Sequence, residues 1–139
     1  MMVFDGQMSG AEAAALWSGL LLLLLLVLSL RVALTRRSRR VSLGDGGDPD
    51  LALKSRVFGN AAEYIPVGIA AMAILATLGI PAVGIHMVGA PLLVGRVLHA
   101  AGLRGDKATT ARVFGILLTW LALFLAALML VVHAFVAPH

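Results

Sequence analysis

Four long apolar segments follow one another along the chain, separated by short stretches that are polar or rich in glycine. The apolar segments cover about residues 11–34, 51–78, 81–103 and 110–136. A helix needs about 20 apolar residues to cross the hydrocarbon core of a bilayer, and each segment is long enough. The pattern therefore predicts an all-α integral membrane protein, a bundle of four transmembrane helices that form a single domain.

The polar stretches predict where these helices begin and end. The sequence GDGGDPD at residues 44–50 combines glycine, aspartate and proline and indicates a loop. Asp50 is placed to act as the N-cap of the second helix. The tripeptide Gly79-Ile80-Pro81 indicates a tight turn, and proline is tolerated in the first turn of the helix that follows.

The composition excludes several classes of protein. Of 139 residues, 60% are hydrophobic and 13% are charged, and the mean hydropathy is +0.99. Soluble domains have about 45–50% apolar and about 25% charged residues, and a small globule cannot bury this much apolar surface. A soluble domain, a disordered chain and a DNA-binding module are therefore excluded. The chain has no cysteine, which excludes disulfides and thiolate metal sites.

The first apolar segment differs from a cleaved signal peptide. A signal peptide has a basic region before its apolar run and a cleavage site of small residues after it. Here Asp5 and Glu12 precede the run, and arginines follow it. We expect a retained helix with its N-terminus outside.

The basic residues concentrate at two places along the chain. The 11 Lys and Arg residues are Arg31, Arg36, Arg37, Arg39, Arg40, Lys54, Arg56, Arg96, Arg104, Lys107 and Arg112. All lie in or next to the first and third interhelical stretches, which predicts that both basic loops face the cytoplasm and both termini face outside. Topology accounts for most of the net charge of +4, so we expect no nucleic-acid partner. The arginines after the first helix are expected to contact anionic membrane lipids.

Some polar residues are not explained by topology. Glu63 and Arg96 each lie inside an apolar segment, where a charged group costs about 2.5–3.5 kcal/mol on insertion scales. Such residues normally face the bundle interior or a wet cavity. Arg56, Asn60 and Glu63 are separated by four and three residues, which puts them on one face of the second helix with Tyr64 beside it.

The third and fourth helices add further donors at the same cytoplasmic side. Arg96 and His99 are three residues apart and share a face, and Arg112 opens the fourth helix. Together with the second-helix residues they form a mostly cationic set with one carboxylate. That set suits a small zwitterionic ligand with more negative than positive charge.

Simpler interpretations exist for the same residues. Glu63 and Arg96 could form a buried ion pair that only fixes helix register. The four histidines lack metal-ligand spacing, so no metal site is expected. Four glycines are interpreted as sites of close helix packing. They are Gly68, Gly84, Gly89 and Gly95.

Two segments resemble the MAPEG family, the membrane-associated proteins in eicosanoid and glutathione metabolism. Residues 56–66, RVFGNAAEYIP, are similar to the family signature R-x-x-x-N-x-x-E-x-x-P, and residues 94–102, VGRVLHAAG, match a third-helix motif. Asp48-Pro49-Asp50 upstream also fits. The loop at residues 40–47 is similar to that of a small bacterial branch.

The resemblance implies a homotrimer in a bacterial inner membrane, with glutathione as co-substrate in a cytoplasm-facing cleft between subunits. It assigns glutathione binding to Arg56, Asn60, Glu63 and Tyr64, with Glu63 the partner of the peptide's amino group. Arg96 would support the site and His99 would line it. A first-helix arginine, either Arg31 or Arg36, would also contribute.

The resemblance also assigns the catalytic role to Arg112, near the glutathione sulfur. A guanidinium favours the thiolate over the thiol, whose pKa is otherwise about 8.5. The implied activity is a glutathione transferase or peroxidase that acts on hydrophobic substrates arriving from the bilayer.

Two alternatives to this activity remain. Active members commonly have third-helix tyrosines where this chain has His99 and Leu103, and Val113 follows Arg112. This departure is consistent with a non-catalytic protein of the MAPEG fold that binds a lipid or a thiol metabolite. A small channel or transporter, with Glu63 and Arg96 along an ion path, is the other alternative.

Overall fold

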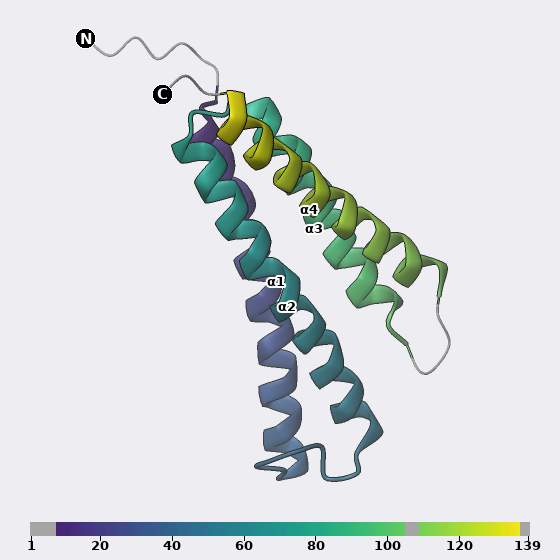
Figure 1. The fold of residues 1–139 in the computed structure, drawn as a ribbon. Helices are drawn as coiled ribbons and strands as arrows, with labels where there is room; N and C mark the ends of the chain where they lie inside the picture. Colours follow the sequence, from purple (N-terminus) through teal and green to yellow (C-terminus); the bar gives the residue numbers. More distant parts are fainter. Residues whose placement is uncertain (1–7, 105–108, 137–139) are drawn as a thin grey trace, which may run out of the picture.

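The computed structural model describes residues 8–104 and 109–136, and this part of the chain is built from four helices (Figure 1). They are α1 (Gly10–Arg39), α2 (Pro49–Thr77), α3 (Ala82–Gly102) and α4 (Thr110–Val136). All four are long and apolar enough to cross a membrane. The all-helical class and the four spans predicted from the apolar segments are thus confirmed. Asp5 and Lys107, used above to predict orientation, lie outside the described residues.

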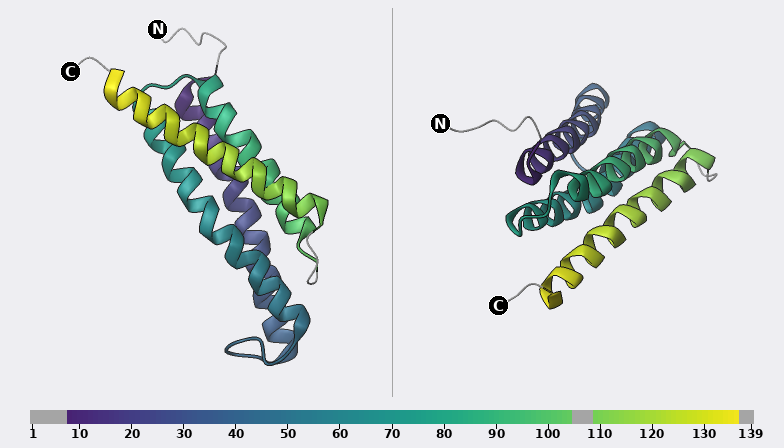
Figure 2. Two further views of the ribbon diagram at one scale, coloured as in Figure 1. Left: turned by 45° about the vertical axis from the view of Figure 1, so that its right-hand side comes forward. Right: turned by 90° about the horizontal axis from the view of Figure 1, so that it is seen from above.

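The helices form two antiparallel hairpins. Helix α3 packs most extensively against α4, and α1 packs against α2, while α1 and α4 do not meet in the described part of the chain. Viewed from above, α1 and α4 lie on opposite sides of α2 and α3 (Figure 2). The hairpins meet near the start of α1 and diverge toward the other end (Figure 1). We call that other end, where α1 and α3 finish and α2 and α4 begin, the basic end.

Helix α1 extends five residues beyond the predicted end at Leu34. The Thr35 hydroxyl donates to the Arg31 carbonyl at 2.8 Å, and the Ser38 hydroxyl donates to the Thr35 carbonyl at 2.9 Å. Arg40 then ends the helix in the left-handed conformation, with φ 56°. The end predicted at about residue 34 is wrong, because apolar character measures the width of the membrane and not the length of the helix.

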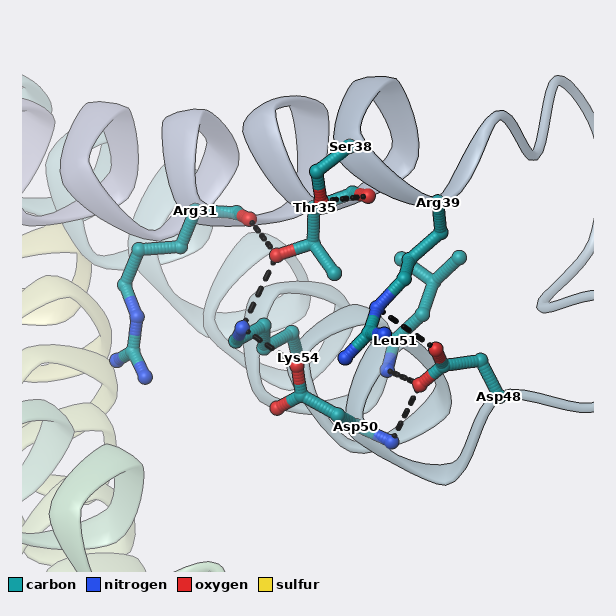
Figure 3. Close-up of polar contacts among 8 residues, drawn as sticks. All are labelled: Arg31, Thr35, Ser38, Arg39, Asp48, Asp50, Leu51 and Lys54. Atoms are coloured by element: carbon teal, nitrogen blue, oxygen red, sulfur yellow. Dashed lines mark hydrogen bonds and ion pairs between the residues drawn. The ribbon is translucent and has the colours of Figure 1, made fainter.

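The N-cap of α2 is Asp48, two residues before the predicted Asp50 (Figure 3). Pro49 occupies the first turn, where its fixed φ favours the helix. The Asp48 carboxylate accepts hydrogen bonds from the N–H groups of Asp50 and Leu51, at 2.9 and 3.0 Å. The Leu51 hydrogen bond holds the pKa of Asp48 below its ordinary value, and the Arg39 guanidinium, 3.1 Å away, lowers the pKa further.

Three of the four glycines interpreted as packing sites, Gly68, Gly89 and Gly95, lie at close contacts between helices. A Cβ on Gly95 would lie 2.8 Å from the Gly115 carbonyl oxygen, so α3 and α4 approach each other backbone to backbone. A Cβ on Gly68 would collide with the Leu92 side chain, and one on Gly84 would lie 2.6 Å from Ile80 Cγ2. The contacts of Gly68 and Gly95 confirm the prediction. The contact of Gly84 is with the turn before its own helix, and the nearest atom of another helix, Met129 Sδ, lies at an ordinary 3.8 Å.

A tryptophan–histidine pair joins α1 to α3 at the end opposite the basic end. The Trp17 Nε1–H group donates to His86 Nδ1 at 2.8 Å, and the two rings meet edge to face with centroids 5.9 Å apart. The indole lies over Gly89, where any Cβ would collide with it. The absence of a side chain at Gly89 is therefore what admits the Trp17 ring.

Candidate functional site

Arg96 is the centre of a polar cluster that joins three helices. Its side chain on α3 is 1% exposed. Arg96 Nη1 donates to Asn60 Oδ1 on α2 at 2.7 Å, and Nε donates to Thr119 Oγ1 on α4 at 2.9 Å. The guanidinium carbon also lies 4.8 Å from the centre of the Tyr64 ring, within the range of a cation–π contact. The structure thus brings together three of the predicted site residues, Arg96, Asn60 and Tyr64.

The buried guanidinium has no carboxylate partner in the described part of the chain. The ion pairs found there join Arg39 to Asp48 and Lys54 to Asp50, and neither belongs to the cluster. Arg96 Nη2 is buried without a hydrogen-bond partner among these residues. A buried charge is costly unless it is paired and fully hydrogen-bonded. Neutral oxygens and an aromatic face therefore take the place that an anion would normally fill.

Glu63 does not form the ion pair with Arg96 that was considered above. The Glu63 side chain is exposed on the outer surface of α2, whereas Arg96 is buried between helices. Arg56, on the same helix, is also exposed. Of the three residues grouped by spacing on α2, only Asn60 contacts Arg96, while Arg56 and Glu63 are exposed. Glu63 accordingly presents a carboxylate at the surface of the chain, in the middle of a helix long and apolar enough to cross a membrane.

An open cleft of about 1180 Å³ lies at the basic end. Three of the predicted binding and catalytic residues line it: Arg36 from α1, Arg56 from α2 and Arg112 from α4. Asp45 and Asp50 also line it, so the cleft carries one more positive charge than negative. The Arg36 guanidinium donates to the Gly44 carbonyl, which holds this side chain against the α1–α2 loop.

The two first-helix arginines face different spaces. Arg31 lines a separate, smaller cavity of about 180 Å³ and is not among the residues that line the open cleft. Arg36 lines the cleft together with Arg56 and Arg112. The sequence could not choose between Arg31 and Arg36 as the first-helix arginine of the site, and in the structure only Arg36 lines the cleft.

His99 lies apart from the cleft. It is 7% exposed, and its backbone packs against Gly115 of α4, where a Cβ would collide with it. Neither cavity described for residues 8–104 and 109–136 includes it among its lining residues. His99 thus occupies a contact between α3 and α4. The same part of the chain holds no group of three or more metal-binding side chains.

Thr119 is the functional neighbour that the sequence pattern did not single out. It is fully buried, accepts from Arg96 and donates to the Gly115 carbonyl at 2.8 Å. Its signal in the sequence is faint, a single hydroxyl within the apolar run of the fourth helix. Threonine often returns its hydroxyl to its own helix, so only the structure shows that it also holds Arg96.

Comparisons with known proteins point to one family. The model of the MAPEG family matches residues 14–132. The chain is also 37% identical over 115 residues to Inner membrane protein YecN of Escherichia coli strain K12, an alignment that covers 83% of this chain and 87% of YecN. The YecN protein of Escherichia coli O6:H1, strain CFT073, matches to the same extent.

Proposed function

The chain is a membrane protein of the MAPEG family, and we propose that it binds glutathione and acts as a glutathione transferase or peroxidase on hydrophobic substrates. The observation that carries the proposal is the convergence of Arg36, Arg56 and Arg112 on one open cleft. Glutathione has two carboxylates, one amino group and one thiol. A cleft with excess positive charge suits its net negative charge.

The family signature gives roles to two arginines of the cleft and to polar residues of α2 and α3 outside it. Arg36 and Arg56 bind the two carboxylates, because guanidinium groups bind carboxylates in a two-pronged geometry. Glu63 binds the amino group. Asn60 offers its amide N–H₂ to the peptide, since its oxygen is taken by Arg96. The family pattern adds Tyr64, which lies against the Arg96 guanidinium that supports the site from behind. His99, which the pattern also includes, is buried at the α3–α4 contact and does not line the cleft.

Arg112 supplies the chemistry. It lies in the first turn of α4, where its backbone N–H donates to the Thr109 hydroxyl at 3.2 Å. A guanidinium beside the glutathione sulfur favours loss of the thiol proton. The thiolate then forms a C–S bond to an electrophile and displaces its leaving group. In the peroxidase reaction two glutathiones are oxidised to the disulfide, while a lipid hydroperoxide is reduced to the alcohol and water.

The position of Glu63 supports assembly as a homotrimer. An exposed carboxylate in the middle of a membrane-spanning helix is unstable against lipid, and a neighbouring subunit would cover it and close the binding site. In this arrangement hydrophobic substrates enter laterally from the membrane. The basic end faces the cytoplasm of a bacterial inner membrane, and both termini face outside.

A second candidate function is binding without catalysis. Leu103 and His99 are buried where active relatives commonly have tyrosines, and Tyr64 lies against Arg96. In that case glutathione, another thiol metabolite or a lipid is held but not turned over. Binding with no turnover of any electrophile or hydroperoxide would favour this second function.

Thiolate formation is the decisive test of the proposal. Glutathione added to the purified protein in detergent should give the ultraviolet absorbance of a bound thiolate. Arg112→Ala should abolish this absorbance and the turnover of a model electrophile. Arg37→Ala is the matched control, because Arg37 is an exposed arginine of α1 outside the cleft, and it should change neither. Intact thiolate formation and turnover in Arg112→Ala would disprove the assigned role, and a monomer mass in native mass spectrometry would disprove the trimer.

A further inference from the structure

A second cavity lies between α1, α2 and α3 near the basic end, and the proposed glutathione site does not use it. Its volume is about 180 Å³. Arg31, Lys54 and Arg104 line it, with Asp50 as its single carboxylate. Among the described residues, the lining of the cavity therefore carries a formal charge of about two positive units within a small volume.

The three cations have nitrogens left to bind a ligand. Lys54 Nζ is held by the Thr35 hydroxyl at 3.0 Å and by the Asp50 carboxylate at 2.7 Å. Arg104 donates through Nε to the Ala101 carbonyl at 2.9 Å, and its Nη atoms make no hydrogen bond within the described residues. Figure 3 shows the Arg31 side chain directed away from the Lys54 network, without a drawn partner. One fixed ammonium and two guanidinium groups thus belong to residues that line the same cavity.

This cavity is separate from the open cleft although both lie at the basic end. Lys54 and Arg56 are two residues apart, which turns them by about 200° around the axis of α2. Arg31 and Arg36 are five residues apart, a turn of about 140° around α1. Each helix therefore sends one cation to the cavity and another to the cleft. The two spaces adjoin, because Asp50, Leu53 and Leu103 line both of them.

The remaining wall of the cavity is apolar. Leu28, Val57 and Leu103 are buried side chains that line it, together with Leu53 and two alanines of α3. A small anion bound by the cations would therefore have hydrocarbon on its other side. That combination is typical of a basic pocket between transmembrane helices that binds a lipid head group.

We propose that this cavity binds a phosphate group, carried by an anionic membrane lipid or by a soluble phosphate compound. Arg31 and Arg104 bind the phosphate oxygens through their guanidinium groups, and Lys54 adds a point charge. Asp50 holds Lys54 in place, so the lysine is oriented before the ligand arrives. The apolar wall accommodates the glycerol and upper acyl region when the ligand is a lipid.

Thermal unfolding of the purified protein in a neutral detergent tests the proposal. The probes are dioleoyl phosphatidylglycerol, dioleoyl glycerol without phosphate, and inorganic phosphate compared with chloride at equal ionic strength. A saturable rise in Tm with phosphatidylglycerol, but with neither dioleoyl glycerol nor inorganic phosphate, identifies a lipid ligand. A rise with inorganic phosphate relative to chloride identifies a soluble phosphate compound. The double variant Arg31→Gln/Arg104→Gln should bind about 25-fold more weakly, at about fivefold for each basic residue.

Three further variants keep the test independent of folding defects. Arg31→Lys/Arg104→Lys retains the charges and should bind much more tightly than the glutamine pair. Ala101→Glu places a negative charge on an exposed lining position and should abolish binding. Arg37→Gln removes an arginine that lines neither cavity and should bind like the wild type. The proposal is overturned if neither phosphate compound raises Tm, or if the glutamine pair and Arg37→Gln respond alike.

Discussion

Arg96 Nη1 donates a hydrogen bond to Asn60 Oδ1 over 2.7 Å, and this contact fixes which way the Asn60 amide faces. The guanidinium has only donors, so the amide oxygen must point toward it. The Asn60 N–H₂ group is therefore directed away from Arg96. A residue buried in the third helix thus sets the hydrogen-bonding character of a residue on the second.

Replacing Arg96 with methionine should destabilise the protein and weaken glutathione binding together. The change keeps much of the side-chain volume but leaves Asn60 and Thr119 without their donor. Hydrogen bonds to charged groups contribute about 1.5–3 kcal/mol each, so we expect the free energy of unfolding to fall by at least about 1.5 kcal/mol. Chemical unfolding in detergent and glutathione titration measure the two effects.

The matched control for this variant is Val97→Met, one position further along α3. Val97 is 46% exposed, so its replacement should change neither stability nor binding. Asn60→Asp adds a second comparison, because a carboxylate gives Arg96 an anionic partner but removes the amide donor. Tm should then hold or rise while glutathione affinity falls. An Arg96→Met protein of wild-type stability would contradict the structural role of the cluster.

Gly95→Ala should separate the third and fourth helices. The new Cβ would lie 2.8 Å from both the Gly115 carbonyl oxygen and the Thr119 hydroxyl, and backbone cannot move aside as a flexible side chain can. Overpacking of this kind costs about 1–3 kcal/mol, which a lower Tm should report. Gly19→Ala is the control, since nothing lies within 4 Å of a Cβ there. Equal Tm values for the two variants would show that the close approach is not needed.

Trp17→Phe should remove one hydrogen bond and leave ring packing over Gly89. The lost N–H to His86 contact should lower the free energy of unfolding by about 1 kcal/mol. Trp120→Phe is a matched control, because Trp120 is 54% exposed on α4 and makes no hydrogen bond within the described residues. Chemical unfolding followed by circular dichroism compares the two variants without relying on tryptophan fluorescence. The assignment fails if Trp120→Phe is the more destabilised.

Asp48 should make the protein less stable in acid. Its pKa is lowered in the folded state, first by the Leu51 N–H and then by Arg39, whereas an unfolded aspartate has a pKa of about 3.9. The ionised cap therefore stabilises the fold above about pH 4, and this contribution is lost as pH falls through the lowered pKa. Asp48→Asn should flatten the fall in Tm between about pH 5 and pH 2. An identical acid profile in the variant would rule out Asp48 as a contributor.

The sequence predicts the helices well because apolar runs report directly on membrane crossing. It predicts the ends less well, as α1 shows, since hydroxyl groups at Thr35 and Ser38 prolong the helix among charged residues. The sequence also misplaces the N-cap of α2, which is Asp48 and not Asp50. Both aspartates flank Pro49, and only the geometry of the turn decides which carboxylate meets the free N–H groups.

The candidate site is only partly predictable for a different reason. Helical spacing identifies which residues of one helix share a face, and it correctly groups Arg56, Asn60 and Glu63. It carries no information about the partner across the helix contact. The buried Arg96 accordingly meets Asn60 and Thr119 rather than Glu63, and Arg31 and Arg36 diverge into different cavities.

The helices have unequal lengths, so they fit a bilayer of a given thickness unequally well. With 21 residues, α3 is about 32 Å long, close to the roughly 30 Å of a hydrocarbon core, whereas the 30 residues of α1 extend about 45 Å. In a thicker membrane α3 is therefore the first helix to become too short for the hydrocarbon core, and it must reduce its tilt or thin the bilayer around it. Helix α1 is still long enough to cross. Arg36 and Arg112 both belong to helices longer than the hydrocarbon core, of 30 and 27 residues, so the short α3 is the helix whose fit to the membrane depends most on acyl-chain length.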